Sequence, residues 1–202
     1  MPYVIRPRRI VSALCAIGVM LLGGAVPAQA RSAPATLNQC EAPVLSQPLS
    51  SAGDANYYFM APGQSVDSFA GSGWSLSGGA SIQQSTLANG SAGAVLDLPS
   101  GAQAVSPSIC VTNEYPFARF MERQVKGSAG VEFAVSYWSG KSWSARYGGQ
   151  VRAPNSSWTL SDQVAMQPSS AAGWQLAQIV LTGGGKSNDF QVYNLYIDPY
   201  RR

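Results

Sequence analysis

Apolar and polar residues alternate along the stretch from Gly130 to Arg152. The first alternating set is Val131, Phe133, Val135 and Tyr137, and the second, after a short gap, is Trp143, Ala145, Tyr147, Gly149 and Val151. A period of two is typical of a β-strand with one buried face. The stretch therefore predicts two neighbouring strands.

The register of this predicted hairpin follows from the same pattern. Pairing Tyr137 with Trp143 places both apolar sets on one face, whereas a shift of one residue sets Tyr137 against Ser144. A buried face resists such a shift because every side chain would change sides. We therefore expect the first register, with a turn over residues 138–142 in which Gly140 supplies a flexible backbone.

Short β-type segments separated by glycine-rich turns continue along the chain. They cover residues 57–60, 73–76, 94–98, 108–112, 117–123, 158–160, 164–166, 174–182 and 190–198. In the last segment the apolar phase changes at Val192-Tyr193, which predicts a β-bulge. Eight to ten such strands and no long helical stripe predict an all-β fold, a two-sheet antiparallel β-sandwich of the jelly-roll kind.

The N-terminus has the three parts of a secretory signal peptide. Arg6, Arg8 and Arg9 precede an apolar run over residues 10–26, which ends in Ala28-Gln29-Ala30. The run of about 17 residues is at the lower limit for a membrane span. We therefore expect a signal peptide over residues 1–30, a leader and covering loop over 31–53, one β-sandwich domain over 54–202, and a secreted, extracellular or cell-surface protein without a membrane span after cleavage.

Removing the predicted signal peptide changes the charge balance. The whole chain has 13 Lys and Arg residues against 10 Asp and Glu residues, a net charge of +3. Three of the basic residues lie in the signal peptide, so the remaining chain is neutral. A neutral chain without a basic run in its interior gives no reason to expect nucleic acid as a partner.

Cys40 and Cys110 are the cysteines that remain after the signal peptide. Export to an oxidising compartment favours a disulfide bond between them, and two buried free thiols are the alternative. Two cysteines in a chain without histidine do not make an ordinary structural zinc site.

Several short segments resemble a known family. They are Cys40 with Pro43, Tyr57 to Phe59 before Ala61-Pro62-Gly63, residues 73–80, Ser106-Pro107 before Cys110, residues 117–120, and the closing residues 192–200. Together they resemble a family of secreted actinobacterial proteins that have a galactose-binding-like jelly-roll domain and no assigned biochemical role. The resemblance implies a β-sandwich related to carbohydrate-binding modules. In such folds the closing strand often carries Ile-Asp-Asp-Val, and here Tyr193 stands in the first Asp position.

The residue types argue against most catalytic machinery. The chain contains no histidine, which removes the usual Ser-His-Asp and Cys-His arrangements. Glu122 and Glu132 are the nearest candidates for a glycosidase carboxylate pair, and both are expected on non-core faces as ordinary solvated charges. We expect no enzyme activity, no cofactor and no metal-ligand set, while the pattern leaves open a structural calcium ion held by backbone carbonyls.

Tryptophan and tyrosine residues are the best candidates for binding. Trp74, Trp143 and Trp158 lie on alternating apolar positions and are expected in the core. Trp138 in the predicted turn, Trp174 at the start of a strand and Tyr115 beside Pro116 are the candidate ligand-binding residues, with Tyr137 a weaker one. Exposed aromatic rings stack on sugar rings while polar neighbours fix orientation.

Three functions are consistent with these patterns. The first is a glycan-binding module, which predicts an exposed aromatic strip with nearby amides. The second is a structural or protein-interaction module of the cell surface, which predicts an apolar patch instead. The third is a hydrolase, which predicts two carboxylates at catalytic spacing. We favour the first, with a cell-wall or environmental glycan as the expected partner.

Overall fold

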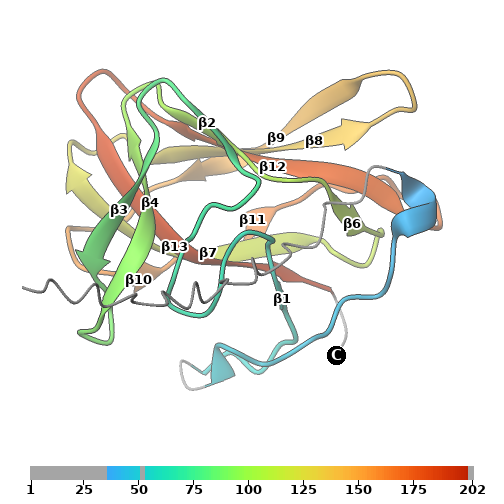
Figure 1. Cartoon of the computed structure of the whole chain (residues 1–202), viewed down its shortest axis with the longest axis horizontal. Helices are drawn as coiled ribbons and strands as arrows, with labels where there is room; N and C mark the ends of the chain where they lie inside the picture. Colours follow the sequence, from blue (N-terminus) through green and yellow to red (C-terminus); the bar gives the residue numbers. More distant parts are fainter. Residues whose placement is uncertain (1–35, 51–52, 200–202) are drawn as a thin grey trace, which may run out of the picture.

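The computed structural model describes residues 36–50 and 53–199. These residues form thirteen β-strands and one short 3-10 helix, η1 (Leu37–Gln39), and the strands make two antiparallel sheets that pack face to face (Figure 1). The predicted all-β sandwich is therefore confirmed. The predicted signal peptide lies outside the described residues.

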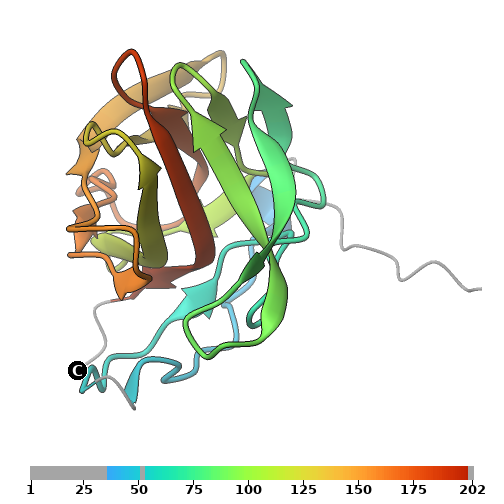
Figure 2. The same cartoon turned by 90° about the vertical axis from the view of Figure 1, so that its left-hand side faces the viewer.

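The larger sheet has seven strands, and Figure 2 shows four of them, β7, β13, β4 and β3, side by side. The main path runs β10-β7-β13-β4-β3, with β1 paired to β13 and β11 paired to β7. The strands are β1 (Phe59–Met60), β3 (Ser81–Thr86), β4 (Ala92–Pro99), β7 (Phe117–Lys126), β10 (Thr159–Leu160), β11 (Val164–Ala165) and β13 (Asp189–Asp198).

The smaller sheet has six strands and carries the predicted hairpin. Its path runs β2-β5-β12-β8-β9, with β6 paired to β12, so that β9 lies at the edge of the sheet. The strands are β2 (Ser75–Ser77), β5 (Gln103–Val105), β6 (Ile109–Val111), β8 (Val131–Trp138), β9 (Trp143–Val151) and β12 (Gln175–Gly183).

The core lies between the inner faces of the two sheets. Phe133 of β8 faces Phe120 of β7, and their rings stack with centroids 6.4 Å apart, while Val135 of β8 is buried in the same cluster. Leu96 and Val192 occupy the same layer from the larger sheet. Burying aliphatic and aromatic side chains of this size contributes about 1.5–3 kcal/mol each.

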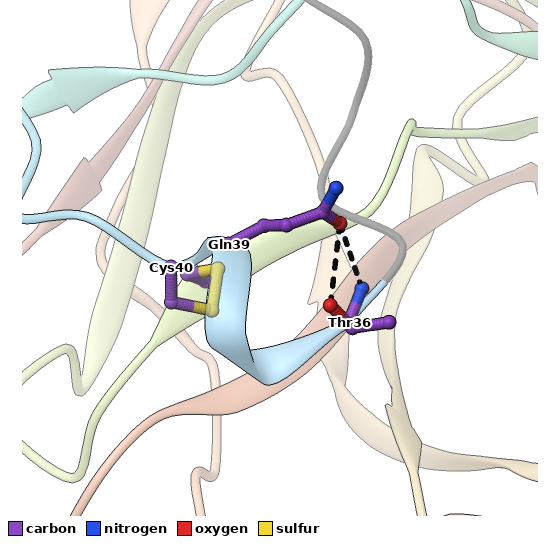
Figure 3. The surroundings of a disulfide bond; sticks show 4 residues. Thr36, Gln39 and Cys40 are labelled. Atoms are coloured by element: carbon purple, nitrogen blue, oxygen red, sulfur yellow. Dashed lines mark hydrogen bonds between the residues drawn. A yellow bond between two sulfur atoms is a disulfide. The ribbon is translucent and has the colours of Figure 1, made fainter.

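The chain before β1 is attached to both sheets. Cys40 is bonded to Cys110 of β6, as predicted, and Thr36 donates two hydrogen bonds to Oε1 of Gln39 in η1 beside that bond (Figure 3). Further along, Leu49 packs with Tyr58 and Tyr196 in a small second cluster on the larger sheet. Residues 36–50 therefore join the outer side of one sheet to that of the other.

The register of the β8–β9 hairpin differs from the prediction by one residue at the turn. Trp138 pairs with Trp143 and Tyr137 with Ser144, and a bulge opposite Phe133 and Ala134 then brings Val131 opposite Val151. The predicted pairing of Tyr137 with Trp143 is therefore wrong. The turn is close to the prediction, over residues 139–142, with Gly140 at φ +90°.

The position of β9 explains the error. The prediction assumed that one face of β9 is buried along its whole length, but residues 143–147 are all exposed because β9 is an edge strand. An exposed strand gives no penalty for the alternative register. Tyr137 itself stays buried, and its partner Ser144 lies beside it without entering the core.

The predicted bulge in the closing strand is confirmed close to the expected position. The pairing of β13 with β7 shifts between Tyr193 and Tyr196, and Asn194 in this interval has φ +50°. Asp67, which also has a positive φ, is held to Asn194 by two hydrogen bonds of 2.8 and 2.9 Å. These reciprocal bonds stabilise two backbone conformations that are otherwise unfavourable for residues with a side chain.

Candidate functional site

The outer face of the six-stranded sheet is open to solvent. Val131, Phe133, Val135 and Tyr137 of β8 are buried, so the alternate residues point away from the core. The outward residues of β8 are Glu132, Ala134, Ser136 and Trp138, and each is exposed or half-buried. Gln178 and Val180 of β12, opposite Ser136 and Ala134, are half-buried in the same way.

Three aromatic side chains on this face form what we call the aromatic strip: Trp138, Trp143 and Tyr147. Trp138 and Trp143 are each 39% exposed, and their rings contact each other with centroids 5.5 Å apart and planes inclined by 51°. Tyr147, opposite Ala134, is 58% exposed. Tyr147 lies four residues from Trp143, so the strip extends about 14 Å along β9.

Five polar side chains cross the same face on a single line, which we call the polar rung. Each member pairs with the next on the neighbouring strand, and the rung consists of Ser77, Gln103, Thr182, Glu132 and Gln150. It extends about 19 Å across five strands. Nε2 of Gln103 donates a 3.5 Å hydrogen bond to Oγ1 of Thr182, while the carboxylate of Glu132 is exposed.

Contacts beneath β9 hold the aromatic strip outside the core. Nε2 of Gln167 donates to the Tyr147 carbonyl, and Nη1 of Arg146 donates to the Gln167 carbonyl. The guanidinium group of Arg146 also lies 4.9 Å from the Tyr137 ring centroid. These contacts occupy the inner side of the strand, so its alternate side chains face solvent.

The disulfide bond closes one end of the face. Cys110 lies directly opposite Leu176 of β12, and Leu176 is buried although it points in the outward direction of the strand. Figure 1 shows η1, which precedes Cys40, beside β6 at this end of the sheet. The disulfide therefore fixes residues 36–40 near the end of the sheet where Trp138 lies.

The predicted ligand-binding residues do not form one group. Trp138 is exposed at the end of β8, as its assignment to the binding face requires. Tyr115 is only 6% exposed and contacts Phe59 edge-to-face at 5.6 Å, which is too little exposure for stacking on a sugar. Trp174 is half-buried against the core, with its ring 6.3 Å from that of Tyr115. Tyr137 is buried and donates its hydroxyl hydrogen to the Met166 carbonyl.

The sequence pattern missed two members of the aromatic strip. It placed Trp143 in the core and Tyr147 on the same expected buried face, because both continue the alternating period, and both assignments are wrong. The pair Gly148-Gly149 interrupts the apolar set, and this interruption was the sequence signal that the residues before it could lie on the other face. A Cβ atom at Gly148 would lie 2.3 Å from the Ala165 carbonyl oxygen, so the strand contacts the neighbouring segment here without a side chain. Trp74 packs in the core, as predicted, while Trp158 is half-buried against the core cluster from the outer face of the larger sheet, beside Tyr193.

The two glutamates considered as a catalytic pair lie in different environments. Glu132 is on the outer face, as expected, but Glu122 is 3% exposed and points into the core beside Val192, so its expected place on a non-core face is wrong. The smaller sheet therefore separates the two carboxyl groups, and they cannot flank one glycosidic bond.

A second polar group lies away from this face and has a structural role. Nη1 of Arg119 and the hydroxyl of Tyr58 both donate to Oδ2 of Asp54, at 2.6 and 2.5 Å. Burial of Asp54 opposes its ionisation, but the hydrogen bonds from Tyr58, Asn56 and Arg119 outweigh this effect and lower its pKa. The group attaches residues 54–58 to β7.

Within residues 36–50 and 53–199, no group of three or more His, Cys, Asp and Glu side chains is arranged to hold a metal ion. No helix in the described part of the chain is long and apolar enough to cross a membrane.

Comparisons with known proteins find similarity in structure alone. No protein-family model matches the chain, and no curated protein matches it. Among solved structures, the CBM22-1–GH10 modules of endo-1,4-β-D-xylanase 10B from Clostridium thermocellum, complexed with xylohexaose, match with 15% identity and a TM-score of 0.42. That match covers 63% of this chain and 26% of the xylanase chain.

Two further structures are isolated modules. A xylan-binding domain of carbohydrate-binding family 22 has 16% identity and a TM-score of 0.44, over 74% of this chain and 99% of the other. A family 11 carbohydrate-binding module from Clostridium thermocellum, in complex with a β-1,3-1,4-mixed-linked tetrasaccharide, has 14% identity and a TM-score of 0.38. That match covers 62% of this chain and 88% of the module's chain. Because all three TM-scores are below 0.5, we base the function on this chain's own residues.

Proposed function

We propose that this protein is a secreted, non-catalytic carbohydrate-binding protein that holds a glycan chain on the outer face of its six-stranded sheet. The observation that carries the proposal is the aromatic strip beside the polar rung. Aromatic rings offer apolar faces to the C–H faces of sugars, and amide, hydroxyl and carboxylate groups fix the sugar hydroxyls.

The dimensions of the face favour a chain of several sugars over a single sugar. Trp138 and Glu132 lie six residues apart on β8, which corresponds to about 20 Å. Ser136 and Gln178 lie between these ends and are half-buried, so they offer hydrogen-bonding groups along the path. A ligand that contacts the strip and the rung together must extend over this distance.

A protein-interaction module is the second candidate. Tryptophan and tyrosine are enriched at the centres of protein interfaces, and the aromatic strip fits that role as well. The polar rung favours the glycan, because the centres of protein interfaces are depleted in charged groups such as Glu132. Trp174 and Tyr115 are not part of the proposed site, because both pack against the core.

The proposal is tested by a binding screen of residues 31–202 against soluble glycans and insoluble cell-wall polysaccharides. Wild type is compared with Trp138→Ala and Trp143→Ala, and thermal melts confirm that each variant folds. Tyr57→Ala is the matched control, because Tyr57 is an equally exposed aromatic residue next to β1, on the other sheet. We expect saturable binding that falls at least tenfold in both tryptophan variants and not in the control.

Two results contradict this proposal. If no glycan binds, glycan recognition is wrong and the aromatic strip becomes a candidate protein interface. If a glycan binds equally well to both tryptophan variants, the site is on another face. Secretion is tested separately by the mass of the protein recovered from the culture medium of its native host, where we expect a chain that begins at Arg31.

A further inference from the structure

Two buried polar groups face each other at one edge of the seven-stranded sheet without hydrogen-bond partners. Glu122 of β7 pairs directly with Thr159 of β10. Oε2 of Glu122 and Oγ1 of Thr159 are both buried and unbonded within the described residues. Buried polar groups are nearly always hydrogen-bonded, so two exceptions at one cross-strand pair require a physical explanation.

The segment that covers Glu122 is fastened on either side of it. The backbone N–H of Gln124 donates to the Asn155 carbonyl at 3.1 Å, and the backbone N–H of Ser161 donates to the Phe120 carbonyl at 2.9 Å. Oγ of Ser161 also accepts from the Phe120 amide at 3.1 Å. These contacts hold residues 155–161 against β7, but β10 itself has only two residues, and its pairing is correspondingly weak.

Trp158 extends this segment over the outer face of the same sheet. Its Nε1 donates to the Thr86 carbonyl at 2.7 Å, and its ring meets Tyr193 edge-to-face with centroids 4.7 Å apart. The guanidinium group of Arg123 lies 4.7 Å from the ring centroid of Trp158. Opening of the segment would therefore uncover Tyr193 and Arg123 as well as Glu122.

We propose that the buried carboxyl group of Glu122, which lies beside Thr159, acts as a proton-dependent latch on residues 155–161. With Glu122 protonated, residues 155–161 stay docked on β7. When Glu122 is ionised, its carboxylate needs hydrogen bonds from water. The docked segment keeps water away from the carboxylate, so the segment opens.

The charged groups around the latch support this behaviour. Arg119 and Arg123, the nearest cations on β7, point to the opposite face and bond Asp54 and Gln191. On the neighbouring strand β13, the residue paired with Glu122 is Val192, which carries no charge. On the facing strand β8, the titratable residue that points into the core is Tyr137, and its hydroxyl donates to the Met166 carbonyl. The negative charge of Asp162 acts on Glu122 and disfavours ionisation.

The direction of the pH effect follows from these surroundings. Burial, and then the charge of Asp162, raises the pKa of Glu122 to about 7 from an ordinary value of 4.5. The open segment exposes the carboxyl group and restores the ordinary pKa. The opening equilibrium constant therefore rises with pH between these two values, by up to about 300-fold, and levels off above them.

The test is amide hydrogen exchange of residues 155–161 at pH 5.5 and pH 8.5, corrected for the intrinsic exchange rate, in wild type and Glu122→Gln. A peptide from β12 is the internal reference. We expect opening of the segment to increase at least tenfold at the higher pH in wild type, and the increase to be absent in Glu122→Gln. Thr159→Val is the matched control: it removes the unbonded hydroxyl, and we expect it to keep the pH dependence.

Three results overturn the latch: no pH dependence in wild type, the same dependence in Glu122→Gln, or an equal dependence in the β12 peptide. The last result would mean that the whole domain loosens instead of one segment. If Glu122→Gln does not fold, a carbon-13 NMR titration of the Glu122 carboxyl in wild type decides, because a midpoint near the ordinary value contradicts the proposal.

Discussion

Trp138 and Trp143 face each other across the last pair of the β8–β9 hairpin, with ring centroids 5.5 Å apart and both rings outside the core. Large apolar side chains that remain exposed in a contiguous group commonly mark an interaction site. Trp143 belongs to the edge strand β9, whose inner side is already occupied by Arg146 and Gln167, and Trp138 ends the neighbouring strand β8. The fold therefore presents the two rings to solvent, where the proposed glycan would contact them.

The first prediction concerns stability. We expect Trp143→Ala to change the free energy of unfolding by less than about 1 kcal/mol, because the ring is exposed at an edge. Phe133→Ala should cost about 3–5 kcal/mol, because Phe133 is fully buried against Phe120. Urea denaturation of both variants checks the contrast. Similar losses in the two variants would mean that the tryptophan pair is part of the folding core.

The second prediction concerns the bulge that sets the register of β9. We expect Gly148→Ala to destabilise the protein by at least about 2 kcal/mol, because the new Cβ would overlap the Ala165 carbonyl and the Phe133 ring. Gly140→Ala is the control: it strains a positive φ in the turn but meets no atom within 4 Å, so about 1 kcal/mol is expected. Thermal melts measure both, and an equal effect would contradict the close packing at Gly148.

The third prediction concerns the disulfide bond. Cys40 and Cys110 are 70 residues apart, and a loop of that length corresponds to about 4 kcal/mol of stabilisation in the chain-entropy model. The double variant Cys40→Ala/Cys110→Ala should therefore be less stable by about that amount in urea denaturation. Adding a reductant should lower wild-type stability similarly and leave the double variant unchanged. A reductant effect on the double variant would point to another cause.

The fourth prediction concerns Asp198 at the end of β13. Burial, and then the charge of Asp54, raises the pKa of Asp198 to about 6 from an ordinary value of 3.8. Because the folded state holds this proton more tightly, wild-type stability should fall as pH rises from about 4 to about 6, by about 3 kcal/mol.

The variant Asp198→Asn removes that ionisation and therefore tests whether stability falls or rises with pH because of this carboxyl group. The variant should lose less stability than wild type between pH 4 and pH 7 in urea denaturation at each pH. Parallel pH curves for the two proteins would show that the carboxyl group titrates normally in the folded state.

The amino-acid sequence by itself determined the architecture and several local features. Period-two patterning over β8, the two remaining cysteines and the phase change in β13 predicted a buried strand, a disulfide bond and a bulge, and all three are present. The buried strand and the bulge depend on residues close in sequence. The disulfide bond joins the two cysteines that remain after the signal peptide, and two free thiols were the alternative. Strand β5 was not predicted, because Gln103, Ala104 and Val105 carry too weak an apolar alternation.

The tertiary structure alone decided which aromatic residues face solvent. Trp143 and Tyr147 carry the same alternating signal as buried residues, but β9 lies at a sheet edge, and the order of strands sets that position. The polar rung likewise joins five strands from distant parts of the chain. Burial of Glu122 depends on the short strand β10 beside it. Each of these properties arises from long-range pairing, which a local pattern of apolar residues does not encode.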